Sequence, residues 1–223
     1  MPSVKQLGQG WYDQLHHCFE KPWWNSLHLK VKARLLVTIP EPGLIFRPFR
    51  ETPFENLKAI ILNTKPEENG EANGLAYGSL TRKSISLLAI DRSLHKTYNA
   101  ISPDNTAEYW AAQGVLMLNV YPTTHSRSLM GHQHQEWLVF LMEVLQAAAN
   151  KKDVVFISWG GFSQYYMQPF QAQTPMISST HPSTNWTEDG NKGFDGKFEQ
   201  INQLLIQLNQ TPIQWTLPQS LSA

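Results

Sequence analysis

The sequence predicts an α/β fold, a three-layer α/β/α sandwich with a central four-stranded, mainly parallel sheet. Short apolar runs alternate along the chain with longer segments of helical periodicity. Such alternation is typical of parallel sheets that are covered by helices on both faces. The 223 residues contain no internal repeat, low-complexity tract or linker, and this length suits one core. We therefore expect a single domain over residues 1–223.

The amino-terminal part is predicted to be helical over residues 7–37, because Leu27, Val31 and Leu35 recur at helical spacing. The prolines and glycine of residues 40–43 end this region. Four apolar runs follow as predicted strands, at residues 58–62, 115–120, 154–159 and 175–178. Helices are expected at residues 84–99, 104–113, 135–149 and 198–209.

Composition restricts the partners and the compartment. Eighteen basic and eighteen acidic side chains cancel, so no overall cationic field attracts nucleic acid. Phosphate contacts would have to come from local groups, such as the backbone N–H groups at helix N-termini. Cys18 is the one cysteine, which excludes a disulfide framework and suits a reducing cytoplasm. Since no apolar run approaches membrane-spanning length and the N-terminus is not a signal peptide, we expect a cytoplasmic protein without a membrane partner.

Polar residues crowd after the first predicted strand. The segment reads Leu62-Asn63-Thr64-Lys65-Pro66-Glu67-Glu68-Asn69-Gly70 and continues, after Glu71, as Ala72-Asn73-Gly74-Leu75-Ala76-Tyr77. In open α/β sheets, ligands bind beyond the carboxyl ends of the strands. This segment is therefore the first candidate for a functional site.

The same segment resembles the catalytic turn of the uracil-DNA glycosylases, which read Gly-Gln-Asp-Pro-Tyr-His and then Ala-His-Gly-Leu-Cys-Phe. Pro66 and the Gly74-Leu75 pair match that pattern. Further matches follow in order along nearly the whole chain: Phe19 to Trp24, Phe46 to Phe49, Thr52 to Lys58, Gln113 to Asn119, Val154 to Gly160, Thr180 to Ser183, Gly193 to Leu205 and Pro212 to Trp215. The resemblance implies an enzyme that flips a nucleotide out of DNA and cleaves the bond between base and sugar.

The resemblance also implies roles for individual residues. His181 matches the residue that hydrogen-bonds the leaving pyrimidine oxygen, and Asn119 the residue that reads the base. Tyr77 matches the aromatic on which the flipped base stacks, and Thr64 lies in the base-binding turn. From residue type alone, the alternatives are a capping histidine, a turn-forming asparagine and a core aromatic. A buried strand end favours base reading by Asn119, because a buried amide is costly unless it is bonded.

DNA contacts are expected from two serines and one loop. Ser183 and, more weakly, Ser84 match serines that contact the phosphate backbone, although each could equally be a helix cap. Asn185 and Trp186 stand where the family has its apolar wedge, and Trp186 could fill the gap left by a flipped base. His125, His132 and His134 are not accompanied by acidic or cysteine ligands at suitable spacing, and we expect neither a metal nor another cofactor.

Two departures from the family pattern change the expected substrate. Glu67 replaces the Tyr that occupies the space next to C5 of the pyrimidine and keeps thymine out. A smaller, charged side chain there would leave an open, acidic pocket that suits sugar hydroxyls. The departure predicts a glycosylase for bulky 5-substituted pyrimidines, such as the glucosylated hydroxymethylcytosine of some bacteriophages, used in defence against them.

Lys65, the second departure, replaces the water-activating Asp, and three interpretations are open. Another residue, Glu67, Glu68, Asn69 or Asn73, activates water in its place. Alternatively, Lys65 contacts a phosphate or the leaving base, or forms a Schiff base with the abasic sugar. In the third interpretation the protein is an inactive, glycosylase-like module that binds DNA or a protein. We predict the enzyme: a monofunctional, monomeric DNA glycosylase acting on a flipped base in double-stranded DNA, with His181, Glu67, Glu68 and Lys65 as its catalytic residues.

Overall fold

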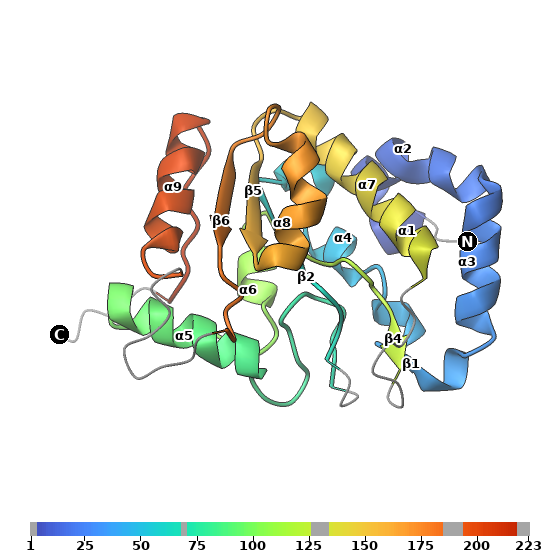
Figure 1. Cartoon of the computed structure of the whole chain (residues 1–223), viewed down its shortest axis with the longest axis horizontal. Helices are drawn as coiled ribbons and strands as arrows, with labels where there is room; N and C mark the ends of the chain where they lie inside the picture. Colours follow the sequence, from blue (N-terminus) through green and yellow to red (C-terminus); the bar gives the residue numbers. More distant parts are fainter. Residues whose placement is uncertain (1–3, 68–70, 126–133, 185–193, 218–223) are drawn as a thin grey trace.

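The computed structural model describes residues 4–67, 71–125, 134–184 and 194–217, and it confirms the predicted α/β/α sandwich (Figure 1). The central sheet consists of β2 (Ala59–Asn63), β3 (Val115–Asn119), β5 (Val155–Trp159) and β6 (Met176–Ser179). Its spatial order is β3-β2-β5-β6, and every neighbouring pair is parallel. All four strands therefore end at the same edge, which is the lower edge in Figure 1.

The sheet separates two apolar cores, because successive residues of a strand point to opposite faces. In β2, Ile60 and Leu62 belong to one core, whereas Ala59 and Ile61 belong to the other. All four side chains are completely buried. The uninterrupted apolar sequence of this strand is thus explained by a parallel sheet that is covered on both faces.

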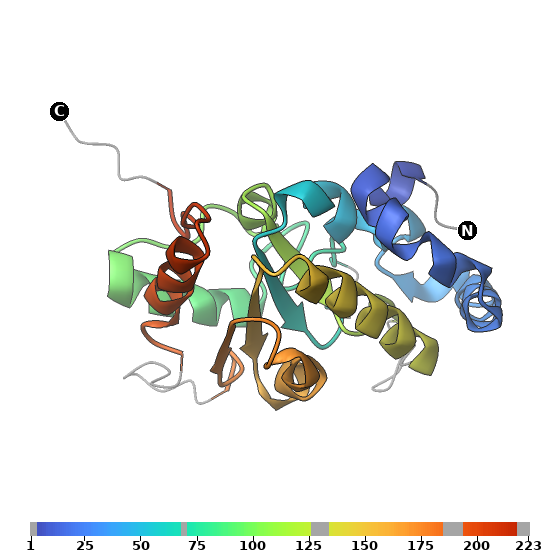
Figure 2. The same cartoon turned by 90° about the horizontal axis from the view of Figure 1, so that it is seen from above.

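Helices supply the two outer layers (Figure 2). One face is covered by α5 (Ile85–Tyr98), α6 (Glu108–Ala111) and α9 (Lys197–Gln207). The other is covered by α2 (Gln9–Leu15), α3 (Pro22–Lys32), α4 (Arg47–Glu51), α7 (Gln135–Asn150) and α8 (Gly161–Met167), with the short α1 (Val4–Leu7) at the amino-terminal end. Each helix in the described part of the chain is too short or too polar to cross a bilayer.

The structure corrects several details of the sequence prediction. The amino-terminal region is broken by a 3₁₀ turn at His16–Glu20, after which Pro22 begins α3 at a position where proline is well tolerated. Most of residues 104–113 is not helical, because the Asp104 carboxylate accepts the backbone N–H groups of Thr106 and Ala107 and forms a turn. The sequence also gave no signal for α4, for α8, or for the small antiparallel pair β1 (Thr38–Ile39) and β4 (Thr124–His125), whose strands are too short to show periodicity.

Candidate active site

A cavity of about 320 Å³ opens at the carboxyl edge of the sheet, between the segments that follow β2 and β6. Its walls are formed by Asn63, Thr64, Lys65, Pro66, Glu67 and His181. Four residues that the sequence nominated, Thr64, Lys65, Glu67 and His181, therefore meet in one place. The volume falls within the range of about 300–1,000 Å³ that is usual for small-ligand sites.

Backbone hydrogen bonds hold the turn that carries Lys65 and Glu67. The N–H of Val120 donates to the carbonyl of Asn63 over 2.8 Å, and the N–H of Tyr121 donates to that of Thr64 over 3.0 Å. These bonds continue the pairing of β2 with β3 beyond the strands. The turn is thus positioned largely by main-chain groups, together with the Asn63 side-chain amide, which donates to the carbonyl of Lys65 over 2.8 Å.

His181 is held as a neutral hydrogen-bond donor. The backbone N–H of Ser183 donates to Nδ1 over 3.3 Å, and the Ser183 hydroxyl lies 2.8 Å from the same nitrogen. Because Nδ1 accepts, the neutral ring carries its proton on Nε2. Burial lowers the pKa of His181, which favours this neutral form. Gly160 makes room for the ring, since a Cβ there would lie 2.9 Å from the His181 Cβ.

Asn119 lies at the end of β3 as predicted, but it is 2% exposed and does not line the cavity. Its Oδ1 accepts a hydrogen bond of 3.0 Å from Nδ2 of Asn63, the residue directly opposite it in the parallel register. Asn63 itself lines the cavity. The sequence prediction did not include Asn63 as a site residue, although a second polar residue ending an apolar strand was a usable signal.

Tyr77 is buried next to His181, one of the residues of the cavity wall. Its ring is 2% exposed and lies next to Trp159 and His181, with ring centroids 5.7 and 6.0 Å apart. It is not among the residues that line the cavity. Its backbone has φ +63°, a strained value for a bulky residue, and Ser84 holds it there by donating to its carbonyl over 3.1 Å.

Two polar residues of the adjoining loop have structural roles. The Ser84 hydroxyl accepts the N–H of Leu87 and caps α5, which favours the helix-cap alternative over phosphate contact. Asn73 is completely buried; its amide donates to the carbonyl of Thr106 and accepts the N–H of Leu75. Because both ends of this amide are engaged, Asn73 is not placed to activate water.

Ser183, which is predicted to contact the phosphate backbone, is exposed, and its hydroxyl lies within hydrogen-bond distance of His181.

Several nominated residues fall outside the described part of the chain. They are Glu68, Asn69, His132, Asn185 and Trp186. The roles predicted for Glu68 and Asn69 in water activation and for Asn185 and Trp186 in DNA contact therefore remain predictions. Among the described residues that line the cavity, Glu67 supplies the carboxylate.

Comparison with known proteins identifies the family. No family model matches the sequence. Among individual proteins, the uracil-DNA glycosylase of Lactobacillus acidophilus is 32% identical over 225 residues, covering 97% of this chain and 96% of that protein. That of Pseudomonas paraeruginosa is 31% identical over 222 residues, covering 96% of both. The chain belongs to the uracil-DNA glycosylase family.

The members of this family are hydrolytic DNA glycosylases, and the fold agrees with that assignment. The crystal structure of mimivirus uracil-DNA glycosylase superposes with a TM-score of 0.83, covering 97% of this chain and 90% of that one at 22% identity. The likeness confirms the fold class expected from the sequence. Within this family fold, the turn after β2 carries a cation, Lys65, beside an acid, Glu67.

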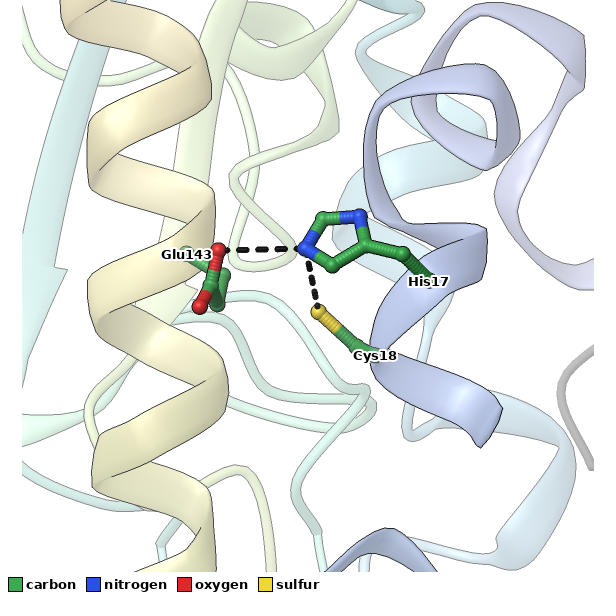
Figure 3. A group of neighbouring side chains, drawn as sticks. All are labelled: His17, Cys18 and Glu143. Carbon is green, nitrogen blue, oxygen red and sulfur yellow. Dashed lines mark hydrogen bonds and ion pairs between the residues drawn. The ribbon is translucent and has the colours of Figure 1, made fainter. Parts of the chain in front are cut away.

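A separate group of potential ligands lies between His17 and Cys18 of the 3₁₀ turn and Glu143 of α7 (Figure 3). The His17 Nε2 is 3.2 Å from a Glu143 oxygen and 3.5 Å from the Cys18 sulfur. Burial, together with Glu143, raises the pKa of the Cys18 thiol to about 12. The thiol is therefore protonated, and the three groups act as polar contacts that join the 3₁₀ turn at His16–Glu20 to α7.

Proposed function

We propose that this family member excises a bulky 5-substituted pyrimidine, such as glucosylated hydroxymethylcytosine, from double-stranded DNA and leaves an abasic site. It would act as a cytoplasmic monomer without a cofactor, in defence against phage whose genomes carry such bases. The observation that carries this proposal is the position of Glu67 in the wall of the same cavity as His181.

His181 supplies the group that a departing base needs. When the bond between base and sugar breaks, its electron pair moves onto the base, and a pyrimidine oxygen gains negative charge. A neutral imidazole that carries its proton on Nε2 can donate this N–H group to that oxygen. One oriented donor of this kind lowers a barrier by about 3–4 kcal/mol in comparable oxyanion sites.

Glu67 has two roles in the proposal. Its carboxylate accepts hydrogen bonds from the hydroxyls of a C5 substituent, and such charge-assisted bonds are stronger than neutral ones. It also accepts a proton from the water whose oxygen attacks the sugar carbon. Both roles use the carboxylate of Glu67, an acceptor-only group that is half-buried in the wall of the same cavity as His181.

Lys65 makes plain uracil a poor substrate in this account. An ammonium group cannot accept a proton from water or offset the positive charge that develops on the sugar. It can stabilise the departing base anion or a phosphate. A small base would also lie loosely beside Glu67, and a misplacement of about 1 Å can cost roughly a hundredfold in rate.

A panel of duplex oligonucleotides tests the proposal. Each would carry one uracil, thymine, hydroxymethylcytosine or glucosylated hydroxymethylcytosine, and abasic sites would be counted. We expect release of the glucosylated base, little release of uracil, and loss of activity in Glu67→Gln. Robust uracil excision would overturn the modified-base assignment. DNA binding without release of any base would favour the inactive binding module.

A further inference from the structure

The contact between the 3₁₀ turn at His16–Glu20 and α7 contains three side chains of the types that bind transition metals. Figure 3 shows His17 and Cys18 facing Glu143, with dashed lines from the His17 Nε2 to the other two groups. The nitrogen, the sulfur and a carboxylate oxygen all lie within 4.8 Å of one another. None of the three residues lines the cavity beside His181, so the group is a separate feature of the molecule.

Hydrogen bonding alone does not match these three groups. The His17 Nε2 lies 3.2 Å from a Glu143 oxygen and 3.5 Å from the Cys18 sulfur. An imidazole nitrogen carries either one hydrogen or one lone pair, and an ionised carboxylate can only accept. If Nε2 carries the hydrogen, it serves Glu143 but offers no lone pair to the thiol proton. If it carries the lone pair, it accepts from the thiol but faces the carboxylate as a second acceptor. A cation among the three atoms would satisfy all of them together.

The separations also fit tetrahedral zinc. Zn²⁺ binds cysteine sulfur at about 2.3 Å, histidine nitrogen at about 2.0–2.1 Å and carboxylate oxygen at about 2.0–2.2 Å. At the tetrahedral angle, such bonds place sulfur about 3.6 Å from nitrogen, and nitrogen about 3.4 Å from oxygen. The observed separations of 3.5 Å and 3.2 Å are close to both values. The ligand atoms are therefore already spaced for coordination.

The electrostatic surroundings of Cys18 favour a bound cation. Burial and then the negative charge of Glu143 raise the pKa of the thiol to about 12, and the smaller effect of Lys21 lowers it. A divalent ion would oppose both of the causes that raise this pKa, because it attracts the thiolate and neutralises the carboxylate. A thiol that coordinates such an ion is deprotonated. Release of its proton would therefore accompany binding of the metal.

We propose that His17, Cys18 and Glu143 bind a zinc ion, which ties the 3₁₀ turn to α7. The side chains of His17 and Glu143 are 46% and 43% exposed, so the ion enters from solvent and water completes the tetrahedron. The ligands come from positions up to 126 residues apart and meet only in the folded chain. Zinc therefore stabilises the folded state. This structural site takes no part in base release, and the inference does not rest on the proposed function.

Cobalt(II) in place of zinc reports directly on sulfur ligation. Full-length protein without a histidine tag would be treated with a chelator and titrated first with Co²⁺ and then with Zn²⁺. We expect one equivalent of Co²⁺ to produce the near-ultraviolet absorption of a thiolate–cobalt bond, and Zn²⁺ to displace it. In weak buffer, zinc binding should release the thiol proton. Absence of the thiolate–cobalt absorption would overturn the inference.

Variants separate this site from adventitious binding. Cys18→Ser should remove the absorption. Glu143→Gln should weaken zinc binding by more than about 100-fold, because loss of a group that merely supports a ligand already costs about 10–100-fold. His95→Gln is the matched control, since this exposed histidine lies on α5, on the other face of the sheet, and its loss should change neither result. Undiminished zinc affinity in Cys18→Ser or Glu143→Gln would overturn the inference.

Thermal unfolding tests the effect of the metal on the fold. The unfolding midpoint of the wild-type protein should rise with zinc concentration, whereas that of Glu143→Gln should not. Since the Glu143 side chain is half-exposed, this variant is expected to fold without the metal. Zinc binding that leaves the wild-type midpoint unchanged would contradict the stabilising role. Failure of the oligonucleotide panel to release a base would overturn the proposed function and leave these metal measurements unaffected.

Discussion

Two loops at the carboxyl edge of the sheet are built in opposite ways. The loop that begins at Asn73 is fixed by buried side chains: the Asn73 amide bonds two backbone groups, and Arg47 donates to the Asn73 carbonyl. Gly74, with φ +94°, packs so closely that a Cβ would lie 2.1 Å from the carbonyl oxygen of Leu44. The turn from Thr64 to Glu67 is instead held through its backbone carbonyls, which accept from the N–H of Tyr121 and from the Asn63 amide, and its side chains line the cavity.

This difference explains how the chemistry can change while the fold does not. Substitutions in the Asn73 loop disturb buried bonds and close packing, so the fold constrains that sequence. In the turn, Lys65 and Glu67 lie at a cavity wall, and the backbone bonds of the turn do not depend on them. The structure thus predicts that stability depends on the first loop and that substrate choice depends on the second.

The largest effect is expected at the cavity wall opposite the turn. His181→Ala removes the donor to the leaving base, and base release should fall by about 10²–10³-fold on the preferred substrate. The midpoint of thermal unfolding should change little, because the ring is half-buried at a loop. Single-turnover rates and thermal melts provide the test, and undiminished base release would exclude the leaving-group role.

The next effect compares the two loops directly. Asn73→Ala leaves a buried carbonyl and a buried N–H without partners, at a cost of about 1–3 kcal/mol each. Lys65→Ala should change the free energy of unfolding by less than about 0.5 kcal/mol, because Lys65 lies at the cavity wall and is only partly buried. Urea unfolding of both variants measures the contrast. Equal destabilisation of the two variants would remove the distinction between the Asn73 loop and the turn from Thr64 to Glu67.

A smaller effect concerns pH. Burial lowers the pKa of His181 from its ordinary value of about 6.5, so the folded protein binds this proton only at lower pH than the unfolded chain. Between the two values the unfolded state binds more protons, and this contribution to stability is therefore lost as pH falls below about 6.5. The stability difference between wild type and His181→Gln should accordingly change below about pH 6.5 and stay constant above it. A difference that changed at higher pH would show a raised pKa instead.

The position of the site followed from sequence because it depends on topology. Apolar runs located the strands, and parallel strands end at one edge, so Thr64, Lys65, Glu67 and His181 were expected to meet there. The pairing of Asn63 with Asn119 depends on strand register across 56 positions, which no local pattern encodes. The buried role of Asn73 likewise depends on Thr106, which contacts it only after folding.

The most direct test of the central claim is the substitution Glu67→Tyr. If Glu67 borders the space for the C5 substituent, an aromatic ring there should abolish excision of glucosylated hydroxymethylcytosine, because ring and sugar would occupy the same volume. Glu67→Gln keeps the size and should also lose excision, because it cannot accept the proton of water, so binding separates the two variants: affinity for a duplex with the glucosylated base should fall more in Glu67→Tyr than in Glu67→Gln, and affinity for unmodified DNA should change little in both. We expect loss of excision with retained DNA binding in Glu67→Tyr. Undiminished excision of the glucosylated base would place the substituent elsewhere and contradict the claim that this turn selects a modified pyrimidine.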